Sequence, residues 1–212
     1  DLINQTLKHN ATHISSFMKK TNNKEDDFEF FFDEASRLVK EHDFVYIYST
    51  NPDHLLHGYG INDEIIRENL IYLECKVKEL VENNPDTLFL LTADHGFANV
   101  EEISFHEHKD FLETLNEAVI SIEGRFATVS VKNEEKFLQL ANKYYGDSFF
   151  IKTKKELLEE HTFGYGEPHE LVDSTTKNYF LIAKDKYSFY QGDEPIGFKG
   201  AHAGSLESET DI

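Results

Sequence analysis

Two scarcities in this sequence exclude whole classes of protein. The 212 residues contain a single cysteine, Cys75, so no internal disulfide framework can hold the fold together. Basic residues are also few: 21 Lys and Arg stand against 40 Asp and Glu, which gives a formal net charge of −19. A protein that binds a nucleic-acid polymer normally presents a basic stripe, so we expect no such partner.

The sequence also lacks long apolar runs and the usual signals at its ends. No run approaches the ~18 residues of a membrane-spanning helix, so we expect no membrane segment, and no signal peptide opens the chain. The first residue is Asp1 instead of Met, and Ile212 ends the chain without a polar tail. We therefore expect a piece of a longer protein. The low cysteine content is compatible with the cytoplasm, which is the compartment we expect, and an extracellular location stays open because the natural N-terminus is missing.

The pattern that is present is an alternation of helices and strands. Between residues 24 and 96, apolar residues recur at helical spacing, then as a short β-type run, and then in the same order again. The predicted elements are a helix over 24–41, a strand over 44–48, a helix over 62–82 and a strand over 88–92. This alternation predicts a layered, mostly parallel α/β sheet, whose ligand sites lie beyond the carboxyl ends of the strands.

Beyond residue 100 the elements become shorter. The sequence predicts helices over 109–119, 134–145 and 154–160 and strands over 125–131 and 148–151. These elements predict a small α+β cap over residues 101–167. The cap would be inserted in an α/β core, which consists of residues 1–100 and is completed by residues 168–212. We expect the apolar run at 179–183 to rejoin the main sheet as a buried strand.

A carboxylate, an imidazole and a glycine, Asp94-His95-Gly96, follow the predicted strand 88–92. An adjacent carboxylate and imidazole can serve as two zinc ligands, and Gly96 lets the backbone turn away beneath a ligand. A polar turn after a core strand would contain the same residue types, and on this stretch alone that alternative stays open.

A second acid and imidazole follow the predicted strand 44–48. Asp53 and His57 lie four residues apart, just after Pro52. If Pro52 starts a helical turn, both side chains lie on one face and can chelate one ion. An aspartate-capped turn with an incidental histidine is the alternative.

The last candidate ligand, His202, stands between small residues in Gly-Ala-His-Ala-Gly. Such neighbours let an imidazole reach inward unobstructed, although a loop with a chance histidine would look the same. Together, Asp53, His57 and His202 supply one oxygen and two nitrogen ligands and leave one coordination position open, as catalytic zinc sites do. Asp94 and His95 supply half of a second set, and two metals about 4 Å apart can clamp both oxygens of a phosphoryl displacement.

These motifs, in this order, resemble the alkaline phosphatase superfamily. The sequence carries Asp-x-x-x-His-x-x-Gly at 53–60, Asp-His-Gly at 94–96 and Gly-x-His-x-Gly at 200–204. The resemblance is strongest to the nucleotide pyrophosphatase/phosphodiesterase-like branch, and this chain would be the C-terminal portion of that fold. Two positions depart from the family pattern: Ile61 stands where proline is common, and Ala203 where a second glycine is common.

The resemblance implies an alkaline-phosphatase-like fold and a hydrolase with two Zn²⁺ ions that acts on a small-molecule phosphate ester or nucleotide. Asp53, His57 and His202 would hold one zinc, and Asp94 and His95 would help to hold the other. In the family, a Ser or Thr nucleophile attacks phosphorus in line and forms a covalent intermediate that water hydrolyses.

The family's nucleophile, and an aspartate that completes the second site, lie upstream of the Asp-x-x-x-His motif. We expect both to be missing from this chain, which alone should be inactive. Hydroxyl residues near the N-terminus lie in polar surroundings with no activating context: Thr6, Thr12, Ser15, Ser16 and Thr21.

Two other interpretations stay open. One is a different branch of the superfamily: a phosphonate hydrolase, a sulfatase or a phosphomutase. The other is a non-catalytic binding module on the same scaffold, in which the histidines are structural. The sequence predicts neither the oligomeric state nor the identity of the substrate.

Overall fold

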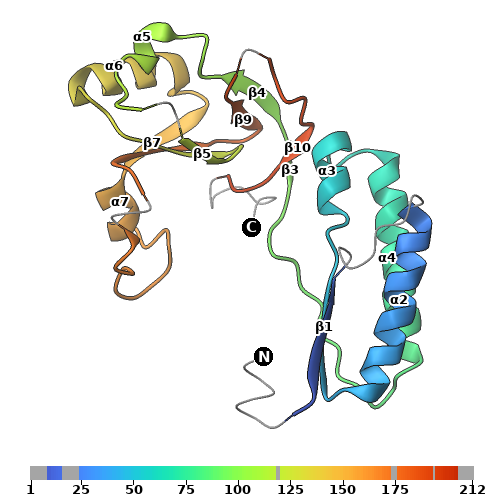
Figure 1. Cartoon of the computed structure of the whole chain (residues 1–212). Coiled ribbons are helices and arrows are strands. Elements are labelled where there is room, and N and C mark those ends of the chain that lie inside the picture. The colour runs from blue at the N-terminus through green and yellow to red at the C-terminus, as the bar shows by residue number, and fades with distance from the viewer. Residues whose placement is uncertain (1–8, 16–23, 118–119, 173–175, 193, 205–212) are drawn as a thin grey trace. The chain divides into compact units, whose positions relative to one another are not determined.

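A computed structural model describes residues 9–15, 24–117, 120–172, 176–192 and 194–204 (Figure 1). The chain divides into two compact units, of which the first comprises residues 1–55 and 62–92 and the second comprises 56–61 and 93–212. No helix among the described residues is long and apolar enough to cross a membrane.

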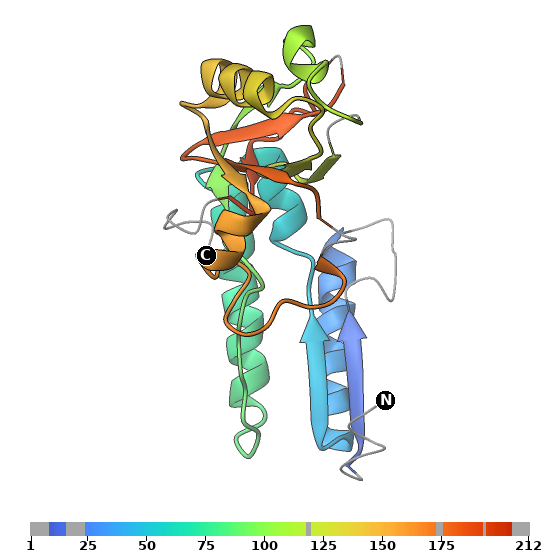
Figure 2. The same cartoon turned by 90° about the vertical axis from the view of Figure 1, so that its left-hand side faces the viewer.

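The first unit contains a pair of parallel strands with one helix directly behind them and a second helix to one side (Figure 2). Its elements are β1 (Ala11–Ser15), α2 (Lys24–Glu41), β2 (Phe44–Tyr48) and α4 (Glu64–Glu82). Ile14 on β1 lies opposite Ile47 on β2, and both pack with Phe31, Phe32 and Leu38 of α2 in one apolar cluster. The helices predicted over 24–41 and 62–82 are confirmed, as is the strand over 44–48.

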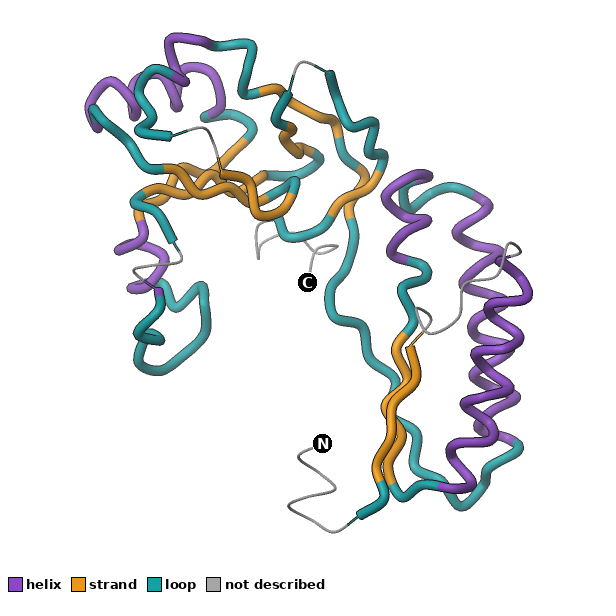
Figure 3. The backbone as a smooth tube through the Cα atoms, viewed as in Figure 1, coloured by secondary structure: helices purple, strands orange, loops and turns teal. Residues whose placement is uncertain are grey.

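The segment that follows α4 is not the buried strand that its leucines predict. Residues 88–92 have no strand assignment, and Figure 3 draws the segment between α4 and β3 as a loop. Leu88, Leu90 and Leu91 are 84%, 87% and 83% exposed. A strand needs a neighbouring backbone for its hydrogen bonds, and within the described part of the first unit β1 and β2 pair with each other. The predicted strand over 88–92 is therefore wrong for this chain.

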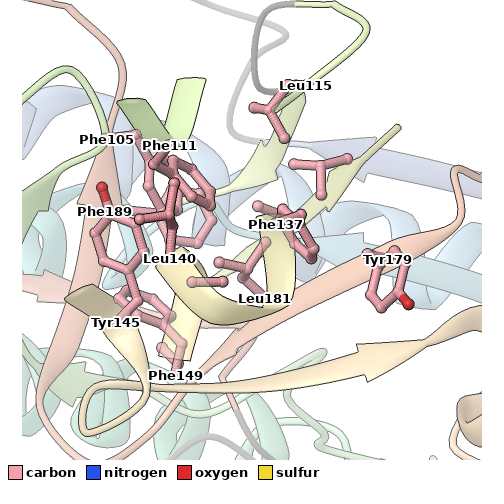
Figure 4. Packing of buried hydrophobic residues seen from close by; sticks show 14 residues of the cluster. Phe105, Phe111, Leu115, Phe137, Leu140, Tyr145, Phe149, Tyr179, Leu181 and Phe189 are labelled. Atoms are coloured by element: carbon pink, nitrogen blue, oxygen red, sulfur yellow. The ribbon is translucent and has the colours of Figure 1, made fainter. Parts of the chain in front are cut away.

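The second unit is built around a four-stranded antiparallel sheet in the order β5-β6-β8-β7. The strands are β5 (Ile120–Glu123), β6 (Phe126–Val129), β7 (Phe149–Thr153) and β8 (Tyr179–Ala183). The helices of the unit are α5 (Lys109–Leu112), α6 (Glu134–Tyr145) and α7 (Lys154–Glu159). Buried aromatic residues from α5, α6 and the strands form the core on one face of this sheet (Figure 4).

Strand β8 is buried along its whole length. Leu181 belongs to the same cluster as Phe137 of α6, whereas Phe180 packs with Leu157 of α7 in a second cluster. The prediction that 179–183 rejoins the sheet of the first unit is wrong, because β8 pairs with β6 and β7. A central antiparallel strand that is covered on both faces has the same continuous apolar sequence as a buried parallel strand, so the sequence alone does not distinguish the two. The division at 100 and 167 stays a prediction.

Two short strand pairs complete the second unit. One pair is parallel, β4 (Glu101–Ser104) with β9 (Tyr187–Tyr190), and the other is antiparallel, β3 (Ala98–Asn99) with β10 (Gly200–Ala201). Arg125, which is fully buried, donates hydrogen bonds of 2.7 Å to the carbonyl oxygens of Asp185 and Tyr187 and so fixes the turn before β9. The candidate ligands His95 and His202 flank the β3–β10 pair, His95 before β3 and His202 after β10.

Candidate metal centre

The helix that follows β2 carries the first two candidate ligands. It is α3 (Asp53–Tyr59), with Asp53 in its first turn and His57 in its last. The predicted helical turn after Pro52 is confirmed, and residues four apart lie on one helix face. The boundary between the units falls inside α3, after Leu55. Because α3 is one continuous helix, Asp53 is held in the same element as His57.

Backbone and side-chain contacts tie the end of α3 to the segment around β10. The Lys199 amide donates to the His57 carbonyl oxygen at 2.9 Å, and Nδ1 of His57 lies 3.0 Å from the carbonyl oxygen of Gly200. A carbonyl only accepts hydrogen bonds, so this contact assigns the proton to Nδ1 and leaves Nε2 as the nitrogen that can bind a metal. The His57 ring packs between Phe97 and Phe198, with centroids at 4.9 and 4.7 Å.

The other two histidines lie against each other. The rings of His95 and His202 stack with centroids 3.7 Å apart and planes inclined by 16°. His202 follows β10, whereas His95 lies three residues before β3, and the pairing of Ala98 with Ala201 brings the two segments together. Nδ1 of His95 lies 3.0 Å from the Gly96 carbonyl oxygen. An Asp94 carboxylate oxygen lies 3.7 Å from Nε2 of His95.

His57, His95 and His202 come together within the second unit, where the His202 ring adjoins both other rings. The three side chains are partly exposed, so an ion from solvent could reach them. Imidazoles, together with the carboxylates of Asp53 on the helix of His57 and of Asp94 beside His95, suit zinc and similar borderline-soft ions.

Sequence reasoning placed His57 with Asp53 and His202, and placed His95 with Asp94. In the second unit the His202 ring adjoins both other histidines, at 5.3 Å from the His57 centroid and 3.7 Å from the His95 centroid. The division of the five residues into two metal sets, and their role as ligands, stay predictions.

Three residues position the segments that carry the candidate ligands, and sequence reasoning gave none of them this role. A Cβ on Gly200 would lie 2.5 Å from the Leu56 carbonyl oxygen, so β10 can approach α3 only because position 200 has no side chain. The Asn99 side chain accepts a hydrogen bond of 2.7 Å from the Ile61 amide, just beyond α3. Phe97 packs against the histidines. Their spacing carries no periodic signal that could have revealed these contacts.

Comparison with known proteins identifies the family. Residues 3–205 match the family model described as type I phosphodiesterase / nucleotide pyrophosphatase. This chain belongs to that family. The resemblance to the alkaline phosphatase superfamily, based on three short motifs, is thereby confirmed, and members of this phosphodiesterase family are metal-dependent hydrolases.

Solved structures of similar fold confirm the α/β fold class of this phosphodiesterase-family chain. The murine ectonucleotide pyrophosphatase / phosphodiesterase 5 matches with a TM-score of 0.65 and 14% identity, over 96% of this chain and 58% of that chain. An inactive variant of the murine protein in complex with AMP gives 0.66 at 15% identity, and the human protein gives 0.61 at 15%, with the same two coverages. No curated protein sequence matches the chain. The chain spans 58% of the length of these solved relatives.

Of the hydroxyl residues considered at the N-terminus, two lie on β1, which pairs with β2 in the first unit. These are Thr12 and Ser15. The other three, Thr6, Ser16 and Thr21, lie outside the described residues.

Proposed function

We propose that this chain is the C-terminal, metal-binding part of a two-zinc phosphodiesterase or nucleotide pyrophosphatase, and that the Ser or Thr nucleophile lies outside it. The observation that carries the proposal is the convergence of His57, His95 and His202 within the second unit, with Asp53 on the same helix as His57. Three ligands brought together from three separate segments of a metal-dependent family are the minimum of a catalytic zinc site with an open position.

The donor set fits zinc in chemistry as well as in number. His57, His95 and His202 would supply imidazole nitrogens, and Asp53 and Asp94 would supply carboxylate oxygens. Asp53 lies on the helix of His57, and Asp94 lies beside His95, so these two pairs are the candidates for two separate sites. The carbonyl oxygen of Gly200 would hold the His57 ring in one orientation through Nδ1, as second-sphere partners of metal-binding histidines do.

Bound zinc would supply charge stabilisation and a binding place for phosphoryl oxygens. That contribution would be needed here because a chain with a net charge of −19 otherwise repels an anionic substrate. We infer a nucleotide or another small phosphate ester as the substrate class of the whole protein. The murine relative of similar fold was solved in complex with AMP, which supports this class.

A zinc titration of the 212-residue chain tests the metal centre. We expect tight binding of about one equivalent, and a loss of at least 10-fold in affinity for Asp53→Asn and His202→Ala, because each removes a ligand. His54→Ala is the matched control, since His54 lies beside Asp53 on α3 and is exposed. Absence of zinc binding by the wild-type chain, or equal losses in the control, would contradict the proposal.

A phosphodiesterase assay tests the second half of the proposal. We expect the chain alone to leave bis-p-nitrophenyl phosphate intact with saturating zinc. Zinc-dependent hydrolysis that Asp94→Ala abolishes would show that the chain contains its own nucleophile. With the full-length protein, relative rates on a diester, a monoester and a sulfate ester separate the phosphodiesterase from the other hydrolases of the superfamily, and inactivity on all three would favour a binding module.

A further inference from the structure

Phe97 occupies an unusual position among the histidines of the metal centre. Its ring centroid lies 4.9 Å from that of His57, 5.5 Å from that of His95 and 5.1 Å from that of His202. The three imidazoles come from different segments of the chain, and Phe97 is the one described phenylalanine whose ring contacts all of them. The side chain is only 8% exposed.

The backbone of Phe97 is anchored to the same strands that carry the ligands. Phe97 directly precedes β3, whose Ala98 pairs with Ala201, and His202 directly follows that pair. Gly200 lies on β10 beside Ala201, and its carbonyl oxygen accepts a hydrogen bond from Nδ1 of His57. The backbone of Phe97 therefore cannot move away from the imidazoles without breaking the β3–β10 pair.

The contact geometry indicates that Phe97 orients the imidazoles by packing. Its ring meets those of His57 and His202 at interplanar angles of 74° and 65°, which are edge-type contacts that aromatic rings prefer. A phenyl group makes no conventional hydrogen bond and no metal bond, so it can neither compete for the ion nor bind the substrate's phosphate. What it can do is limit the rotation of three ligands at once.

We propose that Phe97 is a positioning residue of the metal centre, which holds the imidazoles of His57, His95 and His202 at a spacing that suits a metal before the ion binds. This inference rests on the proposed function, because it assumes that the histidines bind zinc. Ligands that are already oriented lose less conformational freedom on binding, and loss of an orienting partner typically weakens metal binding by about 10- to 100-fold.

The test is a zinc competition titration of the 212-residue chain against a chromophoric chelator, combined with thermal unfolding. For Phe97→Leu, which keeps an apolar side chain but removes the ring, we expect zinc affinity to fall by about 10- to 100-fold. Phe137→Leu is the matched control, since Phe137 is a fully buried phenylalanine of the α6 core. This control should bind zinc as the wild type does while its Tm falls at least as far.

Two further readouts separate positioning from general stability. Phe97→Tyr, which keeps the ring, should restore zinc affinity to within about threefold of wild type. The visible absorption of bound Co²⁺ should change in Phe97→Leu and stay unchanged in Phe137→Leu, because it reports the arrangement of ligands around the metal. Wild-type affinity in Phe97→Leu, or an equal loss in Phe137→Leu, overturns the role of Phe97 alone. Failure of the wild-type chain to bind zinc overturns the proposed function and the role of Phe97 together.

Discussion

At Gly200 the backbone of β10 approaches α3 so closely that no side chain fits between them. A Cβ at this position would lie 2.5 Å from the Leu56 carbonyl oxygen, which is below any real contact, and the obstacle is backbone that cannot rotate away. The same residue's carbonyl oxygen faces Nδ1 of His57. One residue therefore sets both the distance between two segments and the orientation of a candidate ligand.

We therefore expect Gly200→Ala to impair metal binding as well as stability. The added methyl group must displace α3 or β10, which should cost about 1–3 kcal/mol of the free energy of unfolding and weaken zinc binding by about 10-fold or more. Urea denaturation and zinc titration measure the two effects. Zinc affinity equal to that of the wild type would show that the close approach of Gly200 to α3 does not matter for the centre.

Gly58→Ala provides the control on the same helix. Gly58 is exposed within α3, and a Cβ there meets nothing within 4 Å. Alanine should stabilise the helix by about 0.5–1 kcal/mol and leave zinc affinity unchanged.

At the scale of the element, α7 depends on a reciprocal capping box at its N-terminus. The Glu156 amide donates to Oγ1 of Thr153 at 3.1 Å, and the Thr153 amide donates to the Glu156 carboxylate at 2.7 Å. These hydrogen bonds from the backbone and side chain of Thr153 lower the pKa of Glu156 from its ordinary value of 4.5. Leu157, the next residue, is buried against Phe180 of β8, so the cap also holds the helix on the sheet.

The lowered pKa predicts the direction of a pH effect. A carboxylate with a depressed pKa in the folded state stabilises the protein above its unfolded pKa, and this stabilisation is lost as the pH falls through the folded pKa. The stability difference between the wild type and Glu156→Gln should therefore be constant near neutral pH and shrink below pH 4.5. Urea denaturation at a series of pH values measures it.

Two variants on α7 check that interpretation. Thr153→Ala should cost about 1 kcal/mol by removing the cap. Glu159→Gln on the same helix removes only an exposed ion pair with Lys155 at 3.6 Å, which should contribute little. If Glu159→Gln changed the acid dependence as much as Glu156→Gln, the effect would not belong to the capping box.

The elements also show which parts of the fold the sequence could predict. The helices at 24–41, 62–82 and 134–145 were predictable because one amphipathic stripe reports one buried face. An apolar run reports burial but not the partner strand, so the positions of 179–183 and 88–92 were wrongly predicted. β8 has two antiparallel neighbours, and the leucines of 88–91 have no strand neighbour within the described residues.

For the whole molecule, the motifs predicted the family, and they singled out candidate ligands without showing how the chain brings them together. His95 and His202 were each recognisable from local context, because an imidazole beside small residues is a chemical signal. Their contact depends on the pairing of β3 with β10, two strands of two residues each. Such short pairs have no sequence pattern of their own, so the sequence could not show that they bring His95 against His202.

The division of the molecule into two units yields a prediction about where zinc stabilises it. The proposed ligands lie on α3 and around β3 and β10, whereas α2 and the pair β1–β2 form a separate core in the first unit. A ligand stabilises the structure that binds it, by about 2.7 kcal/mol at a free concentration of 100 times Kd. Zinc should therefore slow amide hydrogen exchange in α3, β3 and β10 and leave the exchange of α2 unchanged.

Hydrogen-exchange mass spectrometry with and without zinc measures this distribution of protection. His202→Ala is the control, because it keeps the backbone of the β3–β10 pair and removes one proposed ligand; in this variant the zinc-dependent protection should disappear from all three elements together. Protection that persisted in His202→Ala, or that was as large in α2 as in α3, would mean that zinc binds elsewhere on this acidic surface. Zinc-dependent protection confined to α3, β3 and β10 would instead show that the ion binds at the histidines, because these are the elements that carry or flank them.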